Sequence, residues 1–138
     1  IAKPYRTTLT DRDLVTRIFV KKAPEGTRFR FYKLGRRKAL AISRMTIATL
    51  LNQDESGTVT QFHMTMGATF PKPMLFEDVD ALLIGKKPTQ ADIAAVAEAL
   101  SAKIPLIAGI RASTAYKQPV CNRMVRRILD ELLGGMAQ

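Results

Sequence analysis

The apolar and polar positions near the start of the chain alternate in short runs, a pattern typical of β-strands. The first run, LVTRIFV at 14–20, puts Leu14, Thr16, Ile18 and Val20 on one side and Val15, Arg17 and Phe19 on the other. We therefore predict a strand over 14–20 with one largely apolar face, which ends before the Pro-Glu-Gly turn at 24–26.

A second alternating run, TRFRFYKL, begins after Gly26. Phe29, Phe31 and Lys33 point to one side of a strand here, and Arg28, Arg30 and Tyr32 point to the other. Because helices are expected to cover one face of the sheet, we predict that Phe29 and Phe31 face the core and that the arginines form a solvent-facing or subunit-facing edge. Gly35 indicates a turn with Arg36 and Arg37 at its exit.

Two longer runs predict a hairpin. Residues 39–51, ALAISRMTIATLL, are rich in β-branched and apolar side chains, and 59–68, VTQFHMTMGA, alternate with Phe62, Met64 and Met66 on one face. The polar stretch NQDESGT between them is a turn cluster. We expect His63 on the more polar face, as a solvent-exposed or cross-strand histidine, and Gly67 at the end of the second strand.

The second half of the chain has helical spacing. FEDVDALLIG predicts a helix that ends at Gly85, and TQADIAAVAEALSAKI predicts one with Thr89 as N-cap and Asp92 as its capping-box partner. The last helix contains CNRMVRRILDELL and ends at the Gly-Gly pair 134–135; it either begins near Pro119 or carries a kinked turn upstream, because proline is strained in a helix interior. The predicted apolar stripes are Ile93, Val96, Ala97, Leu100 and Ile104 in one helix and Val125, Ile128, Leu129 and Leu132 in the other.

The strands come first and the helices last, with no βαβ alternation. This order predicts an α+β fold, an antiparallel sheet of three to four strands with about three C-terminal helices packed on one face. The length of 138 residues is that of one domain.

Charge is concentrated at the start of the chain. The net charge is +10, but residues 1–38 carry twelve Lys or Arg against three Asp or Glu, whereas 39–138 carry ten against nine. The stretch FRFYKLGRRKALAIS at 29–43 lies at the centre of this basic region. A local basic surface indicates an anionic ligand or partner nearby, with a solvated charged face as the alternative.

Few residues are suited to catalysis. One cysteine (Cys121) and one histidine (His63) cannot assemble a Cys/His zinc site, and the single cysteine favours a reducing, cytoplasmic location. We expect Cys121 to be a buried, inert thiol, and the acidic cluster 77–80 to favour a helix dipole rather than a metal. The sequence has no P-loop, no G-x-S-x-G and no G-x-G-x-x-G after a strand, so we predict no catalytic residue and no metal site. No apolar run approaches the roughly 20 residues that span a bilayer, and none reads as a leader peptide; the chain begins with Ile1, as expected of a fragment or a processed product.

A set of short motifs runs through the whole chain in a fixed order. They are PYRT at 4–7, Asp13, Lys33, Arg37, residues 39–42, Gly67, Pro71, Pro73, Gly85, Arg111-Ala112-Ser113 and Tyr116. In this order and spacing the chain resembles the C-terminal portion of the FAD-binding (medium) subunit of molybdenum hydroxylases, the group of xanthine dehydrogenases and aerobic carbon monoxide dehydrogenases. It departs from that pattern at Lys117, Gly109 and Leu75, where the family commonly has Arg, Asp and Arg.

The resemblance implies a domain division and a role. Residues 1–27 would be the tail of the FAD-binding region and 28–138 the C-terminal domain, while the glycine-rich loops that hold the FAD pyrophosphate are missing from this sequence. The implied function is to pass electrons from a molybdenum cofactor, through 2Fe-2S clusters on partner subunits or domains, by way of FAD to NAD⁺ or another acceptor. Alone, the chain is not expected to be catalytic or to bind FAD tightly.

The resemblance also assigns cofactor-binding residues. A lysine at the position of Lys33 lies near the flavin ring in this family, where its charge would stabilise the anionic reduced flavin by about a few kcal/mol at an effective dielectric near 20. Arg36 and Arg37 would follow on a loop near the access route of the electron acceptor.

Two other classes of function remain open. The interleaved arginines and aromatics of RFRFYK superficially resemble the stacking platforms of single-strand nucleic-acid binders, although a platform needs aromatics exposed on the sheet face, and we expect Phe29 and Phe31 to be covered. The third class is a structural or oligomerisation domain without a ligand.

Overall fold

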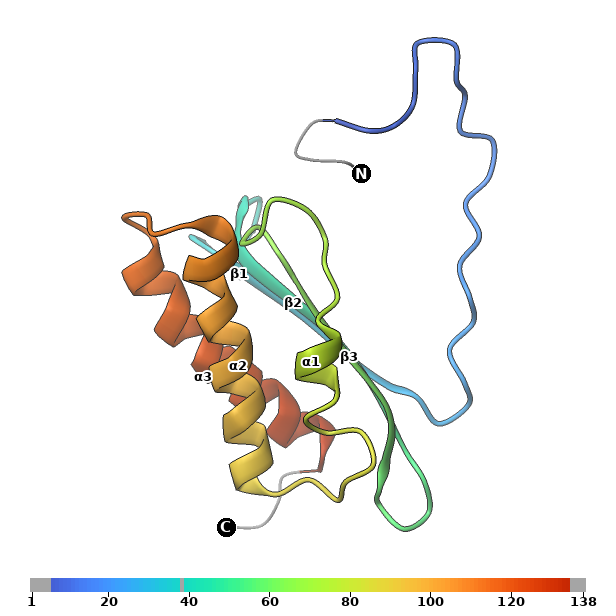
Figure 1. Ribbon diagram of the computed structural model, residues 1–138, viewed down its shortest axis with the longest axis vertical. Coiled ribbons are helices and arrows are strands. Elements are labelled where there is room, and N and C mark those ends of the chain that lie inside the picture. The colour runs from blue at the N-terminus through green and yellow to red at the C-terminus, as the bar shows by residue number, and fades with distance from the viewer. Residues whose placement is uncertain (1–5, 38, 135–138) are drawn as a thin grey trace.

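The computed structural model describes residues 6–37 and 39–134. Over these residues three strands precede three helices (Figure 1): β1 (Arg28–Gly35), β2 (Ser43–Gln53), β3 (Val59–Gly67), α1 (Glu77–Asp80), α2 (Gln90–Ala108) and α3 (Thr114–Leu132). The strands form one antiparallel sheet in the order β1-β2-β3, and α2 and α3 cover one of its faces. The predicted α+β fold is confirmed, as is the hairpin of β2 and β3.

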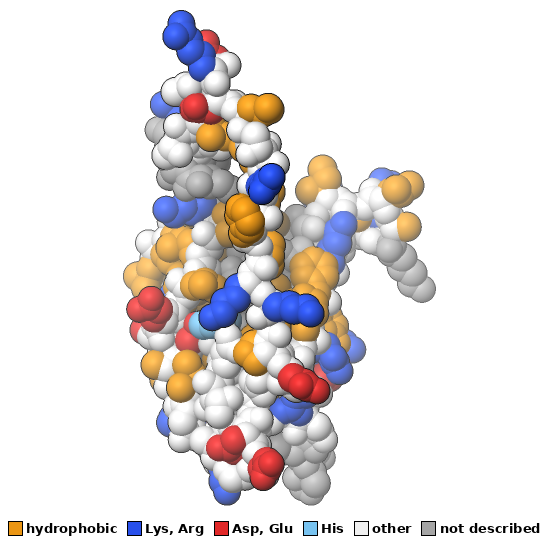
Figure 2. Space-filling model, turned by 90° about the vertical axis from the view of Figure 1, so that its right-hand side faces the viewer, with side chains coloured by type: hydrophobic (Ala, Val, Ile, Leu, Met, Phe, Trp, Pro, Cys, Tyr) orange, Lys and Arg blue, Asp and Glu red, His pale blue; other side chains and the backbone are white. Residues whose placement is uncertain are grey.

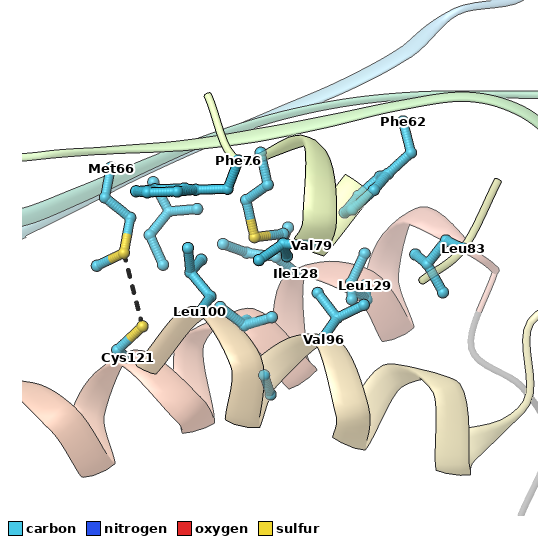
Figure 3. Packing of buried hydrophobic residues seen from close by; sticks show 14 of the residues in the cluster. Phe62, Met66, Phe76, Val79, Leu83, Val96, Leu100, Cys121, Ile128 and Leu129 are labelled. Atoms are coloured by element: carbon cyan, nitrogen blue, oxygen red, sulfur yellow. Dashed lines mark hydrogen bonds between the residues drawn. The ribbon is translucent and has the colours of Figure 1, made fainter. Parts of the chain in front are cut away.

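Alternation along the hairpin places its apolar side chains under the helices. Met45, Ile47 and Leu51 of β2 are buried on the same face as Phe62 and its alternating neighbours in β3. Figure 3 shows Phe62 and Met66 facing α2 and α3, where Leu100 and Ile128 are among the residues labelled. All residues of the two predicted apolar stripes are buried. Methyl and methylene groups packed at this density supply most of the stability of a small domain.

The predicted orientation of β1 is wrong. Phe29 and Phe31 are 56% and 54% exposed on the face of the sheet that carries no helix. The register explains this, because Tyr32 pairs with Ile47 and Leu34 pairs with Met45, and directly paired residues share a face. Tyr32 and Leu34 therefore pack against the core, and the two phenylalanines point away from it.

The predicted strand at 14–20 is also wrong. The segment has no regular secondary structure and runs outside the body of the domain (Figure 1), with Ile18, Phe19 and Val20 each more than 80% exposed. An alternating apolar run forms a strand only where a neighbouring strand and an apolar surface receive it, and the described residues provide neither here.

The helix predictions hold with shifted boundaries. α2 begins as predicted, with the Thr89–Asp92 capping box complete. α1 is a single turn followed by further turns that end at Gly85, whose φ of +78° is readily reached only by glycine. α3 begins at Thr114 and includes Pro119, so the turn upstream of the proline belongs to the helix. Gly135, together with Pro4, Tyr5 and Lys38, lies outside the described residues.

Candidate functional site

A hollow of about 700 Å³ lies where the connection from β1 to β2 meets the start of α3. We call it the basic basin; it is lined by Arg36, Arg37, Leu40, Ala41, Ile42, Ser43, Arg44, Ala68, Ser113, Tyr116 and Lys117. Three segments far apart in the sequence therefore build one site: the β1–β2 connection, the end of β3 and the first turn of α3.

The β1–β2 connection is held by one of its own arginines. Nε and Nη2 of Arg37 donate to the carbonyl oxygen of Leu40 at 3.2 and 2.6 Å. Leu40 has a φ of +49°, in the left-handed region that a leucine rarely adopts, and this conformation turns its carbonyl toward the guanidinium. Arg37 is thus fixed by a neutral carbonyl, and no carboxylate within residues 6–37 and 39–134 forms an ion pair with it.

The wall opposite comes from α3 and β2. The Arg44 guanidinium lies over the Tyr116 ring, 5.6 Å from the ring centroid. Nζ of Lys117 donates to the carbonyl oxygen of Ala68 at 2.7 Å, and Ala68 also has a positive φ of 59°. Burial, and then the charges of Arg111 and Arg44, lowers the pKa of the Lys117 ammonium.

The structure brings two of the three predicted cofactor-binding residues together. Arg36 and Arg37 both line the basic basin. Lys33 does not; it is exposed on the uncovered face of the sheet, next to Thr46 of β2, which in turn pairs with Gly67 of β3. A β-carbon at position 67 would lie 2.4 Å from Oγ1 of Thr46, so this position accommodates only glycine. The Thr46 hydroxyl therefore has no side chain beside it on the β3 side.

Sequence reasoning missed other residues of the basin, namely Arg44, Ser113, Tyr116 and Lys117 as side chains of a site. A signal was present, because Ser113 and Tyr116 belong to the RASTAYK motif that carried the family resemblance. What could not be foreseen was that this motif lies beside the GRRKALAIS stretch.

The uncovered face of the sheet is a second candidate surface. Figure 2 views the molecule from this side, with the segment before β1 in front of the sheet and the histidine visible behind it. Phe29, Leu50 and Leu75 surround a small hollow of about 110 Å³ that His63 also lines. Since Phe29 and Phe31 are exposed, the argument from the sequence against base stacking no longer applies.

His63 is tied to the core side of the molecule by a buried carboxylate. Its Nδ1 lies 2.8 Å from Oδ2 of Asp80, whose other oxygen accepts the backbone N–H of Met64 at 3.3 Å. Burial raises the pKa of Asp80, and the hydrogen bond and charge of His63 oppose that shift. The acidic cluster at 77–80 thus does more than favour the dipole of a one-turn helix: Asp80 joins α1 to β3, and Asp78 pairs with Lys103 of α2 at 2.6 Å.

Cys121 is buried, as predicted; its Sγ lies 3.6 Å from Sδ of Met66 (Figure 3), and burial raises its pKa to about 12. Within residues 6–37 and 39–134, His, Cys, Asp and Glu form no group of three that could hold a metal ion. None of the helices in the described part of the chain is long and apolar enough to cross a membrane.

The arrangement of the sheet and helices recurs in solved structures of other proteins. Carbon monoxide dehydrogenase from Hydrogenophaga pseudoflava matches with a TM-score of 0.71 and 23% identity, over 86% of this chain and 40% of that chain. Quinoline 2-oxidoreductase from Pseudomonas putida 86 matches with a TM-score of 0.65 and 16% identity, over 80% of this chain and 39% of that chain. At these identities the likeness defines the fold.

The family follows from the sequence match. The model of the CO dehydrogenase flavoprotein C-terminal domain matches residues 30–132, and the chain belongs to this family. A curated relative, the nicotinate dehydrogenase FAD-subunit of Eubacterium barkeri, is 28% identical over 134 residues. That alignment takes in 94% of this chain and 45% of the relative, so the chain spans less than half of the relative's length.

Proposed function

We propose that the chain is the C-terminal part of the FAD-binding subunit of a molybdenum hydroxylase, with residues 1–27 as the tail of the FAD-binding region and 28–138 as the C-terminal domain. The observation that carries this proposal is the row formed by Lys33, Thr46 and Gly67 on the uncovered face of the sheet. It sets an exposed cation and a hydroxyl beside a position without a side chain, which suits the edge of a flat, polar ring.

FAD, when bound, would supply the redox chemistry, taking electrons from iron–sulfur clusters and a molybdenum cofactor on partner subunits and passing them to NAD⁺ or another acceptor. The part of this chain is electrostatic. Lys33 places a positive charge at the ring edge, which favours negative charge on the ring by about a few kcal/mol at an effective dielectric near 20. When FAD is bound, the apolar faces of Phe29 and Phe31, which are exposed in this structure, would exclude water from the same surface.

Arg36 and Arg37 have a different role from Lys33 in this proposal. Both follow Lys33 by a few residues but line the basic basin rather than the sheet face. We assign them to the route by which an anionic acceptor approaches, because fixed cations raise the local concentration of an anion.

The experiment uses the complete subunit that contains this chain. We expect that subunit to purify yellow, and Lys33→Gln to lower the flavin midpoint potential because a stabilising charge is removed. Lys87→Gln, which removes an exposed lysine of the connection before α2, is the matched control and should leave the potential unchanged. A complete subunit without flavin absorbance, or equal potentials for Lys33→Gln and the unchanged protein, contradicts the proposal.

A second candidate function is supported by the exposed aromatics. Phe29 and Phe31 stand on an uncovered sheet face with Lys33 of the same strand, the arrangement that a base-stacking platform needs. The family assignment ranks this candidate second. It is tested by titrating the chain with a single-stranded oligonucleotide at several salt concentrations: saturable binding that Phe31→Ala weakens roughly tenfold or more supports a platform, and its absence removes the candidate.

A further inference from the structure

The cations of the basic basin are positioned by the protein without being neutralised. Arg37 and Lys117 are each held by a backbone carbonyl, that of Leu40 and that of Ala68. Arg44 is held by the face of the Tyr116 ring. A carbonyl oxygen or an aromatic face orients a cation but brings no full negative charge, so these contacts fix the side chains and leave the site positive.

Several cations elsewhere in the domain, by contrast, form ion pairs with carboxylates. The ion pairs among residues 6–37 and 39–134 couple Arg30, Lys86, Lys103, Arg126 and Arg127 to carboxylates, at distances from 2.6 to 3.8 Å. None of these pairs includes a residue that lines the basic basin. Four like charges around one hollow repel each other. Burial, and then the charges of Arg111 beside the basin and of Arg44 within it, lowers the pKa of Lys117.

The shape and lining of the basin indicate the kind of anion. Arginine guanidinium groups match the geometry of phosphate oxygens, and the hydroxyls of Ser113 and Tyr116 add neutral donors. A carboxylate brings one charge to a site that offers four, whereas a phosphoryl group brings about two and three acceptor oxygens. The adjoining wall of Leu40, Ala41 and Ile42 is apolar, and two of these side chains are 93% exposed, so an organic substituent can be covered there.

We propose that the basic basin is a binding site for a phosphoryl group, either a free phosphate or the phosphate of a small organic molecule. Arg36, Arg44 and Lys117 contact the phosphate oxygens, Arg37 holds the connection that forms the wall, and the apolar residues cover the substituent. The site shares no residue with the row of Lys33, Thr46 and Gly67, so it stands if the flavin role of that row fails. It names the kind of anion that Arg36 and Arg37, proposed above to attract an anionic acceptor, would bind.

The test is an isothermal titration of the full 138-residue chain with inorganic phosphate, pyrophosphate and ADP, at constant ionic strength in chloride. We expect saturable binding of one equivalent. Arg44→Gln and Lys117→Gln should each weaken it about tenfold or more, as expected when a charge-assisted hydrogen bond is lost. ADP bound more tightly than pyrophosphate indicates an organic phosphate; equal affinities indicate that the phosphate alone is recognised.

The matched controls separate a site from a general effect of charge. Lys87→Gln also removes one positive charge, but just before the N-terminus of α2 and outside the basin. The affinity should change by no more than about twofold, because salt screens the effect of a distant charge. Arg44→Lys and Lys117→Arg keep the charge and should retain most of the binding, and thermal unfolding of each variant verifies that it is folded. The proposal is overturned by binding that does not saturate, by an equal loss in Lys87→Gln, or by malonate binding as tightly as pyrophosphate.

Discussion

Nδ1 of His63 lies 2.8 Å from the buried carboxylate of Asp80, and this contact joins the one-turn helix α1 to the last strand of the sheet. The histidine side chain is 44% exposed, whereas the carboxylate is 5% exposed. Removing the histidine therefore leaves a buried acid with only the Met64 backbone N–H as a partner.

We expect His63→Ala to make the stability of the protein fall as the pH rises from about 4 to 7. Burial raises the pKa of Asp80 above its usual 3.8, so the folded state binds a proton that the unfolded state has lost, and stability declines as the pH rises through that window. The cost at pH 7 should be about 1–3 kcal/mol, as for an unsatisfied buried group. Urea unfolding at both pH values measures it.

The control for this prediction is the double variant His63→Ala/Asp80→Asn. It also lacks the histidine but has no carboxylate to titrate, so the decline between pH 4 and 7 should be smaller than in His63→Ala. Equal pH profiles for the two variants would show that titration of Asp80 is not the source of the decline.

Two threonines on opposite faces of the sheet should respond oppositely to the same substitution. The hydroxyl of Thr49 is buried and makes no hydrogen bond within the described residues, whereas that of Thr65 donates to the Met74 carbonyl at 2.7 Å. Thr49→Val removes an unsatisfied polar group and should stabilise the protein by about 1 kcal/mol; Thr65→Val removes a hydrogen bond and should destabilise it by a similar amount. Denaturant midpoints at pH 7 distinguish them, and a Thr49→Val loss would reveal a partner for that hydroxyl.

Cys121 should be unreactive in the folded protein. Burial raises its pKa to about 12, so almost no thiolate exists at pH 8, and thiolate is the reactive form. We expect iodoacetamide to modify Cys121 only when denaturant unfolds the chain, as mass spectrometry would report. Cys121→Ser, by contrast, should be destabilising because it places a hydroxyl among apolar side chains. Rapid modification without denaturant would mean that α3 opens readily from the sheet.

The capping box of α2 predicts an acid-sensitive contribution to stability. Hydrogen bonds from the Thr89 hydroxyl and backbone, and then from Lys86, lower the pKa of Asp92 to about 2. The stabilisation is present above about pH 4, the ordinary pKa of an aspartate, and is lost as the pH falls toward 2. Asp92→Ala should cost about 1 kcal/mol at pH 7 and much less at pH 2. Glu55→Ala, in an exposed turn, serves as the comparison and should cost nothing measurable at either pH.

Sequence reasoning located the β2–β3 hairpin and α2 correctly, because the residues that specify each element are near one another in the chain. The hairpin follows from strict alternation on both sides of a polar turn, and α2 follows from the Thr89–Asp92 box and an unbroken apolar stripe. Each is specified by residues within one continuous stretch of the chain. The same holds for the burial of Cys121, which follows from its place on the helix.

The predictions that were wrong or incomplete concern features that depend on residues distant in the sequence. Both sides of β1 carry aromatic residues, so only its register against Met45 and Ile47 determines that Tyr32 and not Phe31 meets the core. The basic basin joins Arg36 to Tyr116 across most of the chain, and no periodic pattern signals such a meeting. The run 14–20 has the composition of a strand, yet the part of the chain that the structure describes gives it nothing to pair with.

β1 is an edge strand of the sheet, so the positive charges along it affect the solubility of the chain. An edge strand with exposed phenylalanines invites a second molecule to add a strand of its own, and lysine or arginine along the edge opposes such lateral growth by mutual repulsion. Arg30 alternates with those phenylalanines, and Lys33 follows on the same face of the strand as they do. Because added salt screens repulsion between exposed charges, the separate chain should become more prone to self-association as ionic strength rises.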